Sequence, residues 1–239
     1  MLPELSVPTY IIEIPSTKEK IKIRCFLVKE EKILALALQD GEKQHVLNAL
    51  KEVVTNCSYG KLDVSKLTSF DFEYIFLQLR SKSKTNIVEL SFTCKNEIEG
   101  KPCNHVNKFN LDIDKAKVSD IPSTKIQLRK DKDIGIVLKF PNLDAMMEIE
   151  EAIQKNDVNY MYKNLYKFID CAYEGQKVFT DFTPEQFEEW LGQLNSSEFA
   201  KIEKFFSNLP KLTQTFDIQC GKCGYKEGVT LEGLQSFLD

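Results

Sequence analysis

The chain has 239 residues, 42% of them hydrophobic and 10% aromatic, which is ample for a packed core. Its formal net charge is −4 and its sequence pI is about 5.5, so a nucleic-acid phosphate backbone is not expected to be its main partner. The N-terminus lacks the basic start and apolar run of a secretory leader, and no apolar stretch is long enough to span a bilayer. We therefore predict a globular protein of the cytoplasm that does not bind membranes.

The first elements of the chain are predicted to be a strand hairpin and two helices. Residues 12–38 indicate two strands, and the stretch Ile33–Leu38 is apolar enough to be buried on both faces. Residues 44–57 carry apolar side chains at helical spacing and predict a helix. Residues 70–80 are apolar on almost every side and predict a second, buried helix.

Two segments place cysteines between predicted strands. The strand IVELSFTC ends at Cys94, and the stretch VNKFNLDID after Cys103 alternates apolar and polar residues again. Near the C-terminus, Cys220 and Cys223 separate the strand TQTFDIQ from another alternating segment. Two such hairpins that bring four thiolates together form a zinc ribbon, because Zn²⁺ takes four ligands tetrahedrally in closed structural sites. We predict one structural Zn²⁺ ion held by Cys94, Cys103, Cys220 and Cys223.

The spacing of the first cysteine pair leaves alternatives open. Cys94 and Cys103 are separated by KNEIEGKP instead of the roughly two to four residues usual in a zinc hairpin. His105 could replace one thiolate, or all four cysteines could be free thiols. Cys220 and Cys223 could also form a redox pair, but the glycine-rich segment that follows them offers no helix N-terminus to lower a thiol pKa. The remaining cysteines are expected to be structural thiols: Cys25, Cys57 and Cys171.

The second half of the chain repeats the order of the first. The sequence IPSTK occurs at Ile14–Lys18 and again at Ile121–Lys125, and residues 134–140 predict a strand. Helices are predicted at 143–154, 158–169, 183–194 and 197–209. We therefore predict an α+β fold of two similar halves, each a β-hairpin plus helices, joined by a zinc-ribbon-like pair of cysteine hairpins. The halves are residues 1–115 and 116–239, or together one compact domain that shares the metal site.

The residue inventory argues against an enzyme. His45 and His105 are the only histidines, and neither lies in a nucleophile motif. The sequence has no glycine-rich loop that could hold phosphates. Adjacent carboxylates such as Glu188 and Glu189 do not face each other on a helix, and a zinc ion with four protein ligands has no open position for catalysis. We predict no catalytic residues and place His45 on the surface.

Several long stretches resemble one protein family. The runs IPSTKEKIKIRCFLVKEEKILALAL, LTSFDFEYIFLQLRSKS and FTCKNEIEGKPC are similar to the hub and hub-assembly proteins of the baseplate of T4-like bacteriophages. The resemblance implies a non-enzymatic role in building the central hub of a contractile-tail baseplate, with other hub proteins as partners. It also implies a location in the host cytoplasm during assembly or, for a protein that stays in the particle, in the tail baseplate of the virion.

A zinc-ribbon nucleic-acid-binding protein is the alternative from another functional class. Basic residues that could form patches are Lys22, Lys82, Lys84, Lys125, Arg129 and Lys130. Aromatic and basic residues do not interleave on the predicted ribbon strands, which disfavours this alternative.

The C-terminal segment TLEGLQSFLD has an apolar face with little polar cover. A helix or turn would bring together Leu231, Leu234, Phe237 and Leu238. This face either packs onto the protein's own ribbon or docks into another hub component.

Overall fold

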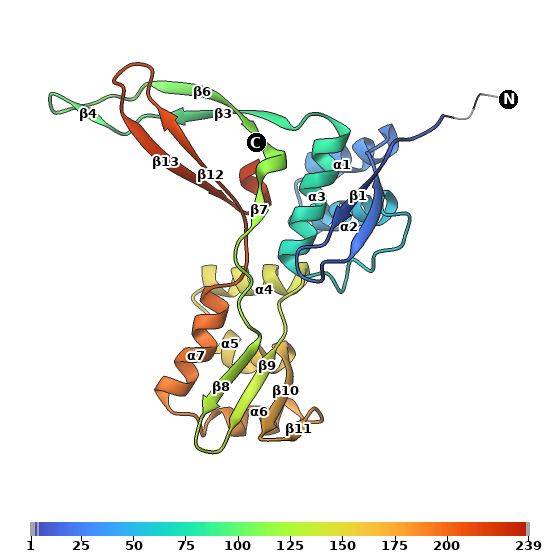
Figure 1. Cartoon of the computed structure of the whole chain (residues 1–239), viewed down its shortest axis with the longest axis vertical. Helices are drawn as coiled ribbons and strands as arrows, with labels where there is room; N and C mark the ends of the chain where they lie inside the picture. The colour runs from blue at the N-terminus through green and yellow to red at the C-terminus, as the bar shows by residue number, and fades with distance from the viewer. Residues whose placement is uncertain (1–2, 4, 238–239) are drawn as a thin grey trace. The chain divides into compact units, whose positions relative to one another are not determined.

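The computed structural model describes residue 3 and residues 5–237 (Figure 1). Its contacts divide the chain into two compact units, which are Met1–Val64, Phe70–Ser119 and Lys211–Asp239 for unit 1, and Ser65–Ser69 and Asp120–Pro210 for unit 2. The sequence predicted two halves that meet between residues 115 and 116. The division by contacts differs, because the C-terminal segment joins unit 1.

Unit 1 begins with a β-hairpin followed by a capped helix. β1 (Thr9–Glu13) pairs antiparallel with β2 (Lys20–Arg24). Arg24 forms a buried ion pair with Glu30, with 2.9 Å between guanidinium nitrogen and carboxylate oxygen. The Glu30 side chain also accepts a backbone N–H bond at the start of α1 (Val28–Asp40), so it fixes where the helix begins.

The prediction of a buried strand at Ile33–Leu38 is wrong, because these residues lie in α1. The run of leucine and alanine alternates like a strand, but both residues have high helix propensity and Glu30 caps a helix just before them. The stretch is not buried on both faces either, since Leu36 and Leu38 are 56% and 68% exposed.

Both other helices predicted in the first half are confirmed. α2 (Lys43–Cys57) buries one face, as its helical spacing predicts. α3 (Ser69–Ser83) is buried almost all round, and the apolar side chains that it contributes to the core are Phe70, Phe72, Ile75, Phe76, Leu77 and Leu79.

Two antiparallel ribbons form the other part of unit 1, and Figure 1 shows them with their turns at the same end. The first ribbon is β3 (Ile87–Thr93) with β6 (Val106–Asp112), and the second is β12 (Leu212–Gln219) with β13 (Lys226–Glu232). The shorter elements are β4 (Glu97–Ile98), β5 (Lys101–Pro102), the 3₁₀ helix η1 (Ile113–Lys115), β7 (Lys117–Val118) and the 3₁₀ helix η3 (Leu234–Phe237). The strands predicted around the cysteines are thereby confirmed.

The C-terminal apolar segment packs into unit 1. Leu234 and Phe237 in η3 are buried, and Phe237 is among the largest fully buried side chains. Leu238 lies outside the described residues. The structure therefore favours packing on the protein's own ribbon over docking into a partner.

Unit 2 is a four-stranded antiparallel sheet with helices. The strand order is β11 (Lys177–Phe179), β10 (Ile169–Glu174), β9 (Ile134–Leu138) and β8 (Lys125–Arg129). The helices are α4 (Leu143–Gln154), α5 (Val158–Asn164), the 3₁₀ helix η2 (Leu165–Phe168), α6 (Pro184–Leu191) and α7 (Ser196–Ser207). Apolar residues of the sheet and helices form one core, which includes Leu128, Ile136, Leu138, Phe187, Ile202 and Phe205.

The helix predicted over residues 158–169 is too long. α5 ends at Asn164, and Ile169 already begins β10. Residues of β10 pair with β9, so a long-range strand pairing ends the helical segment where local periodicity would continue it. Cys171 consequently lies in β10.

The mixed α+β class is confirmed, but two similar halves are not found in the described residues. Ile14–Lys18 forms the turn between β1 and β2, whereas the second IPSTK, at Ile121–Lys125, leads into β8. The two copies of this sequence therefore have different structural roles, and the second half does not repeat the helix order of the first.

Candidate metal centre

The turns of the two ribbons in unit 1 each carry two cysteines. Cys220 and Cys223 lie in the turn between β12 and β13, which is a short CxxC knuckle. In this knuckle the Cys220 N–H donates to the Tyr225 carbonyl at 2.8 Å, and the Gly224 N–H donates to the Cys220 carbonyl at 2.9 Å. Gly224 has φ of 72°, a left-handed conformation that glycine adopts at little cost.

The turn between β3 and β6 has the same backbone bonds in spite of its longer sequence. The Cys94 N–H donates to the His105 carbonyl at 2.9 Å, and the Asn104 N–H donates to the Cys94 carbonyl at 3.2 Å. Asn104 has φ of 49° and takes the place that Gly224 has in the other knuckle. Asparagine tolerates this conformation better than most residues do.

The extra residues between Cys94 and Cys103 form a hairpin inserted into this knuckle. β4 and β5 pair with each other, with left-handed residues at the turn between them, and the Cys103 N–H donates to the Asn96 carbonyl at 2.7 Å. This bond closes the base of the insertion, residues 97–102, so that Asn96 and Cys103 lie next to each other. The unusual spacing is thus a CxxC knuckle interrupted by a β-hairpin, a feature that sequence spacing alone did not reveal.

The four sulfur atoms form a compact group. The Sγ atoms of Cys94 and Cys223 are 3.7 Å apart, those of Cys103 and Cys220 are 3.9 Å apart, and all four lie within 4.8 Å of one another. A tetrahedral ion with metal–sulfur bonds of about 2.3 Å requires sulfur separations of about 3.8 Å, whereas a disulfide needs about 2.05 Å. The arrangement is therefore compatible with a bound metal ion.

The environment of the group favours ionised sulfur at one knuckle. The backbone N–H of Cys223 outweighs burial, and with the Lys222 N–H and the Asn107 side chain it lowers the pKa of the Cys220 thiol to about 6. At Cys94 the Asn96 N–H acts to lower the pKa, but burial and the neighbouring thiols raise it to about 12. Four close thiolates repel one another, and a divalent cation is the counter-charge that would allow all of them to ionise.

Neighbouring residues hold the knuckles in place. The Gly221 N–H donates to the Asn107 side chain of β6 at 2.9 Å, so it joins the second knuckle to the first ribbon. The Asn96 side-chain amide donates to the Cys223 sulfur at 3.7 Å. Three of the four cysteines are buried, and Cys223 is half-buried. His105 has an exposed side chain and lies outside the group of potential ligands.

One further group of potential ligands occurs in the described chain, and it is exposed. His45 contacts the carboxylates of Asp40 and Glu42, and the hydrogen bond with Asp40 raises its pKa. The prediction of a surface position for His45 is confirmed. Exposed acidic groups of this kind are common on protein surfaces, so we assign no site to them.

Comparisons with known proteins give one match. A model of the family described as "T4 bacteriophage base plate protein" matches residues 7–239. No curated protein matches the chain. No solved structure matches it either. None of the helices in the described residues combines the length and the apolar composition needed to cross a membrane.

Proposed function

Because the chain belongs to the T4 bacteriophage base plate protein family, we propose that it is a non-enzymatic baseplate hub protein or hub-assembly factor. It acts through contacts with other baseplate hub proteins, in the host cytoplasm during assembly or in the virion tail. The family match over nearly the whole chain carries this proposal, and the four-cysteine group gives it a structural rationale.

We propose that Cys94, Cys103, Cys220 and Cys223 hold a structural Zn²⁺ ion. Zinc suits four thiolates in a tetrahedral arrangement, and the sulfur separations of 3.7 and 3.9 Å support such an arrangement. Four protein ligands fill the coordination shell, so the ion would stabilise the two knuckles and leave no position for a substrate.

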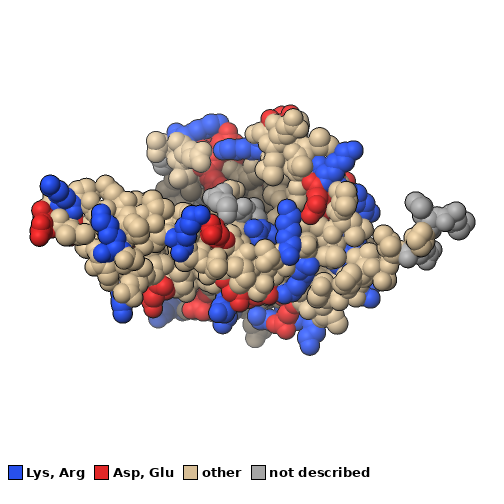
Figure 2. Space-filling view, turned by 90° about the horizontal axis from the view of Figure 1, so that it is seen from above, with Lys and Arg blue, Asp and Glu red and all other residues tan. Residues whose placement is uncertain are grey.

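The positions of the basic residues weigh against the nucleic-acid alternative. Lys82 is paired with Asp114, and Arg129 is paired with Glu198. Lys125 lies over the ring of Tyr173. On the face seen in Figure 2, basic and acidic side chains are interspersed, so no extended basic surface is available there for a phosphate backbone.

Elemental analysis tests the metal site. We expect about one zinc per chain in freshly purified protein. Cys220→Ser should lose most of the zinc, whereas Cys171→Ser, a cysteine of unit 2, should retain it. Protein that contains iron in place of zinc, or no metal together with a melting temperature that a chelator leaves unchanged, would refute the zinc assignment.

Affinity purification from infected cells tests the role in assembly. A tagged chain should co-purify identified hub proteins of the baseplate, and mass spectrometry of mature particles separates a hub component from an assembly factor that leaves. Purification of the chain without any baseplate protein, from cells in which tails are assembling, would count against the proposed function.

A further inference from the structure

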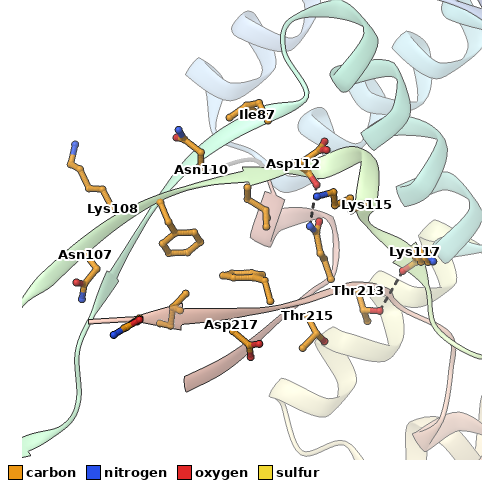
Figure 3. A pocket seen from close by; sticks show the side chains of 16 residues that line it. Ile87, Asn107, Lys108, Asn110, Asp112, Lys115, Lys117, Thr213, Thr215 and Asp217 are labelled. Carbon is orange, nitrogen blue, oxygen red and sulfur yellow. Dashed lines mark hydrogen bonds between the residues drawn. The ribbon is translucent and has the colours of Figure 1, made fainter. Parts of the chain in front are cut away.

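Unit 1 contains an open slot between the two ribbons. The slot has a volume of about 710 Å³ and lies between β6 and β12 (Figure 3). Phe109 and Phe216 meet across it with ring centroids 5.0 Å apart, and Leu111 and Ile218 add to its apolar lining. Figure 3 shows the slot bordered along its length by these two strands.

The edge of β6 at the slot has no strand partner in the described chain. β6 pairs only with β3. The Asp112 carbonyl accepts a hydrogen bond from the Gln214 side chain at 3.0 Å, so this carbonyl points away from β3. Main-chain groups alternate in direction along an antiparallel strand, and the N–H and C=O groups of Asn110 and Lys108 therefore point to the same open edge.

The edge of β12 is open in the same way. β7 covers it only at Leu212 and Thr213. The Leu212 carbonyl accepts a bond from Gly233 on the β13 side, so alternation directs the main-chain groups of Thr215 and Asp217 toward the open edge. The slot thus has two rows of main-chain donors and acceptors that no described strand pairs.

A buried acceptor in the slot also lacks a donor. Gln214 is 8% exposed, and its amide nitrogen bonds to the Asp112 carbonyl. Its oxygen, Oε1, receives no hydrogen bond from any residue that the structure describes. Buried side-chain acceptors are normally satisfied by a protein group or an ordered water, so this oxygen does not identify a partner.

Two lysines and one carboxylate, Asp112, line this end of the slot, so basic side chains outnumber acidic ones there. Lys115 and Lys117 line it, both are exposed, and neither forms an ion pair with a described residue. An acidic side chain placed next to them would be attracted without having to displace an existing partner.

We propose that the slot binds an extended segment of another baseplate protein. The segment pairs its main chain with the open edges of β6 and β12 and places acidic side chains near Lys115 and Lys117. Its apolar side chains occupy alternate positions against Phe109 and Phe216. Strand addition of this kind obtains affinity from main-chain bonds and specificity from alternate side chains. The inference rests on the proposed function for the class of partner.

Synthetic peptides that tile the baseplate proteins of the same phage provide the probe. Binding to the full zinc-loaded chain is measured by fluorescence anisotropy. We expect one peptide with alternating apolar residues and a carboxylate near one end to bind. A segment that lies between two strands directs alternate N–H groups to β6 and to β12, so N-methylation should weaken binding about tenfold at successive positions along the paired stretch and little outside it.

Variants of the slot provide the second measurement. The double variant Lys115→Glu/Lys117→Glu should weaken the peptide about tenfold. Lys226→Glu is the matched control, because Lys226 is exposed on β13 and does not line the slot. Zinc content and melting temperature show that each variant is folded.

The possible failures are distinguishable. Absence of any binding peptide, or binding that neither N-methylation nor the lysine reversals weaken, overturns the inference. If intact baseplate proteins bind wild type and the double lysine variant equally well, the slot is not their binding site, and the proposed function is unaffected. If no intact baseplate protein binds the wild-type chain, the proposed function fails as well.

Discussion

The residue that follows the last cysteine of each knuckle has a positive φ angle. Gly224 has φ of 72°, and a Cβ atom built there would meet no heavy atom within 4 Å. The requirement for glycine is therefore one of backbone conformation and not of space. Asn104 has φ of 49° at the equivalent position, which shows that asparagine is compatible with the knuckle.

Replacement of Gly224 tests this equivalence. Gly224→Val should lower the free energy of unfolding of the zinc-loaded protein by about 1–2 kcal/mol, because a β-branched residue is strained in the left-handed region. Gly224→Asn should cost clearly less. Urea denaturation measures both, and equal losses for the two variants would show that the knuckles are not equivalent.

The ion pair between Glu198 and Arg129 makes the stability of unit 2 depend on pH. Its carboxylate accepts from Arg129 at 2.7 Å and from the Asn195 N–H at 2.9 Å. The bond from Arg129, followed by that from Asn195, lowers the pKa of Glu198 to about 2 from an ordinary value of 4.5. The pKa is lower in the folded state, so this stabilisation is complete above pH 4.5 and is lost as the pH falls toward 2.

Melting curves across this range test the carboxylate. Wild type should lose melting temperature as the pH is lowered below 4.5, and Glu198→Gln should start lower but change less over the same range. Glu203→Gln is the control, because Glu203 is an exposed carboxylate on the same helix. Parallel curves for wild type and Glu198→Gln would contradict the assignment.

At the scale of elements, the inserted hairpin β4–β5 is separable from the knuckle that carries it. All of its residues are exposed, and the bond between Cys103 and Asn96 already brings its ends together. Its removal would convert the first turn into the CxxC spacing of the second.

Deletion of residues 97–102 should therefore preserve the metal centre. We expect unchanged zinc content and a free energy of unfolding within about 1 kcal/mol of wild type, since a short surface loop contributes little to chain entropy. Deletion of Asn96 together with Cys103, which removes a ligand, should abolish zinc binding. If the first deletion also releases the metal, the inserted hairpin is a necessary part of the site.

At the scale of the whole molecule, the four-cysteine group and the core of unit 2 belong to different parts of the chain. All four cysteines of the group lie in unit 1, while the core of unit 2 is built entirely from residues between Leu128 and Phe205, with further apolar residues packed against it. Unit 2 contains one cysteine, Cys171.

A fragment of residues 120–210 should fold without metal. We expect dispersed amide resonances, a cooperative thermal transition, no bound zinc and no effect of a chelator, because its apolar core is self-contained. The full chain should show a second transition that shifts to lower temperature when the chelator is added. A fragment without dispersed resonances would show that unit 2 needs the rest of the chain.

Local sequence patterns determined much of this protein. Residues 44–57 and 143–154 have apolar side chains at helical spacing, and both form helices at nearly those bounds. The alternating strands beside the cysteines also form as predicted, because their periodicity matches a ribbon with one buried face. The grouping of Cys94, Cys103, Cys220 and Cys223 could be predicted because cysteine pairs in hairpin turns are typical of zinc sites; that they hold zinc stays a prediction.

Tertiary structure decided what local patterns leave open. β10 begins at Ile169 because β9 is available for pairing, although local periodicity predicts a helix there. The same holds for the knuckle around Cys94, whose inserted hairpin closes through one backbone bond, and for Phe237, whose burial depends on the rest of unit 1. Each of these outcomes depends on contacts between residues that sequence spacing does not connect, so only the folded chain could settle them.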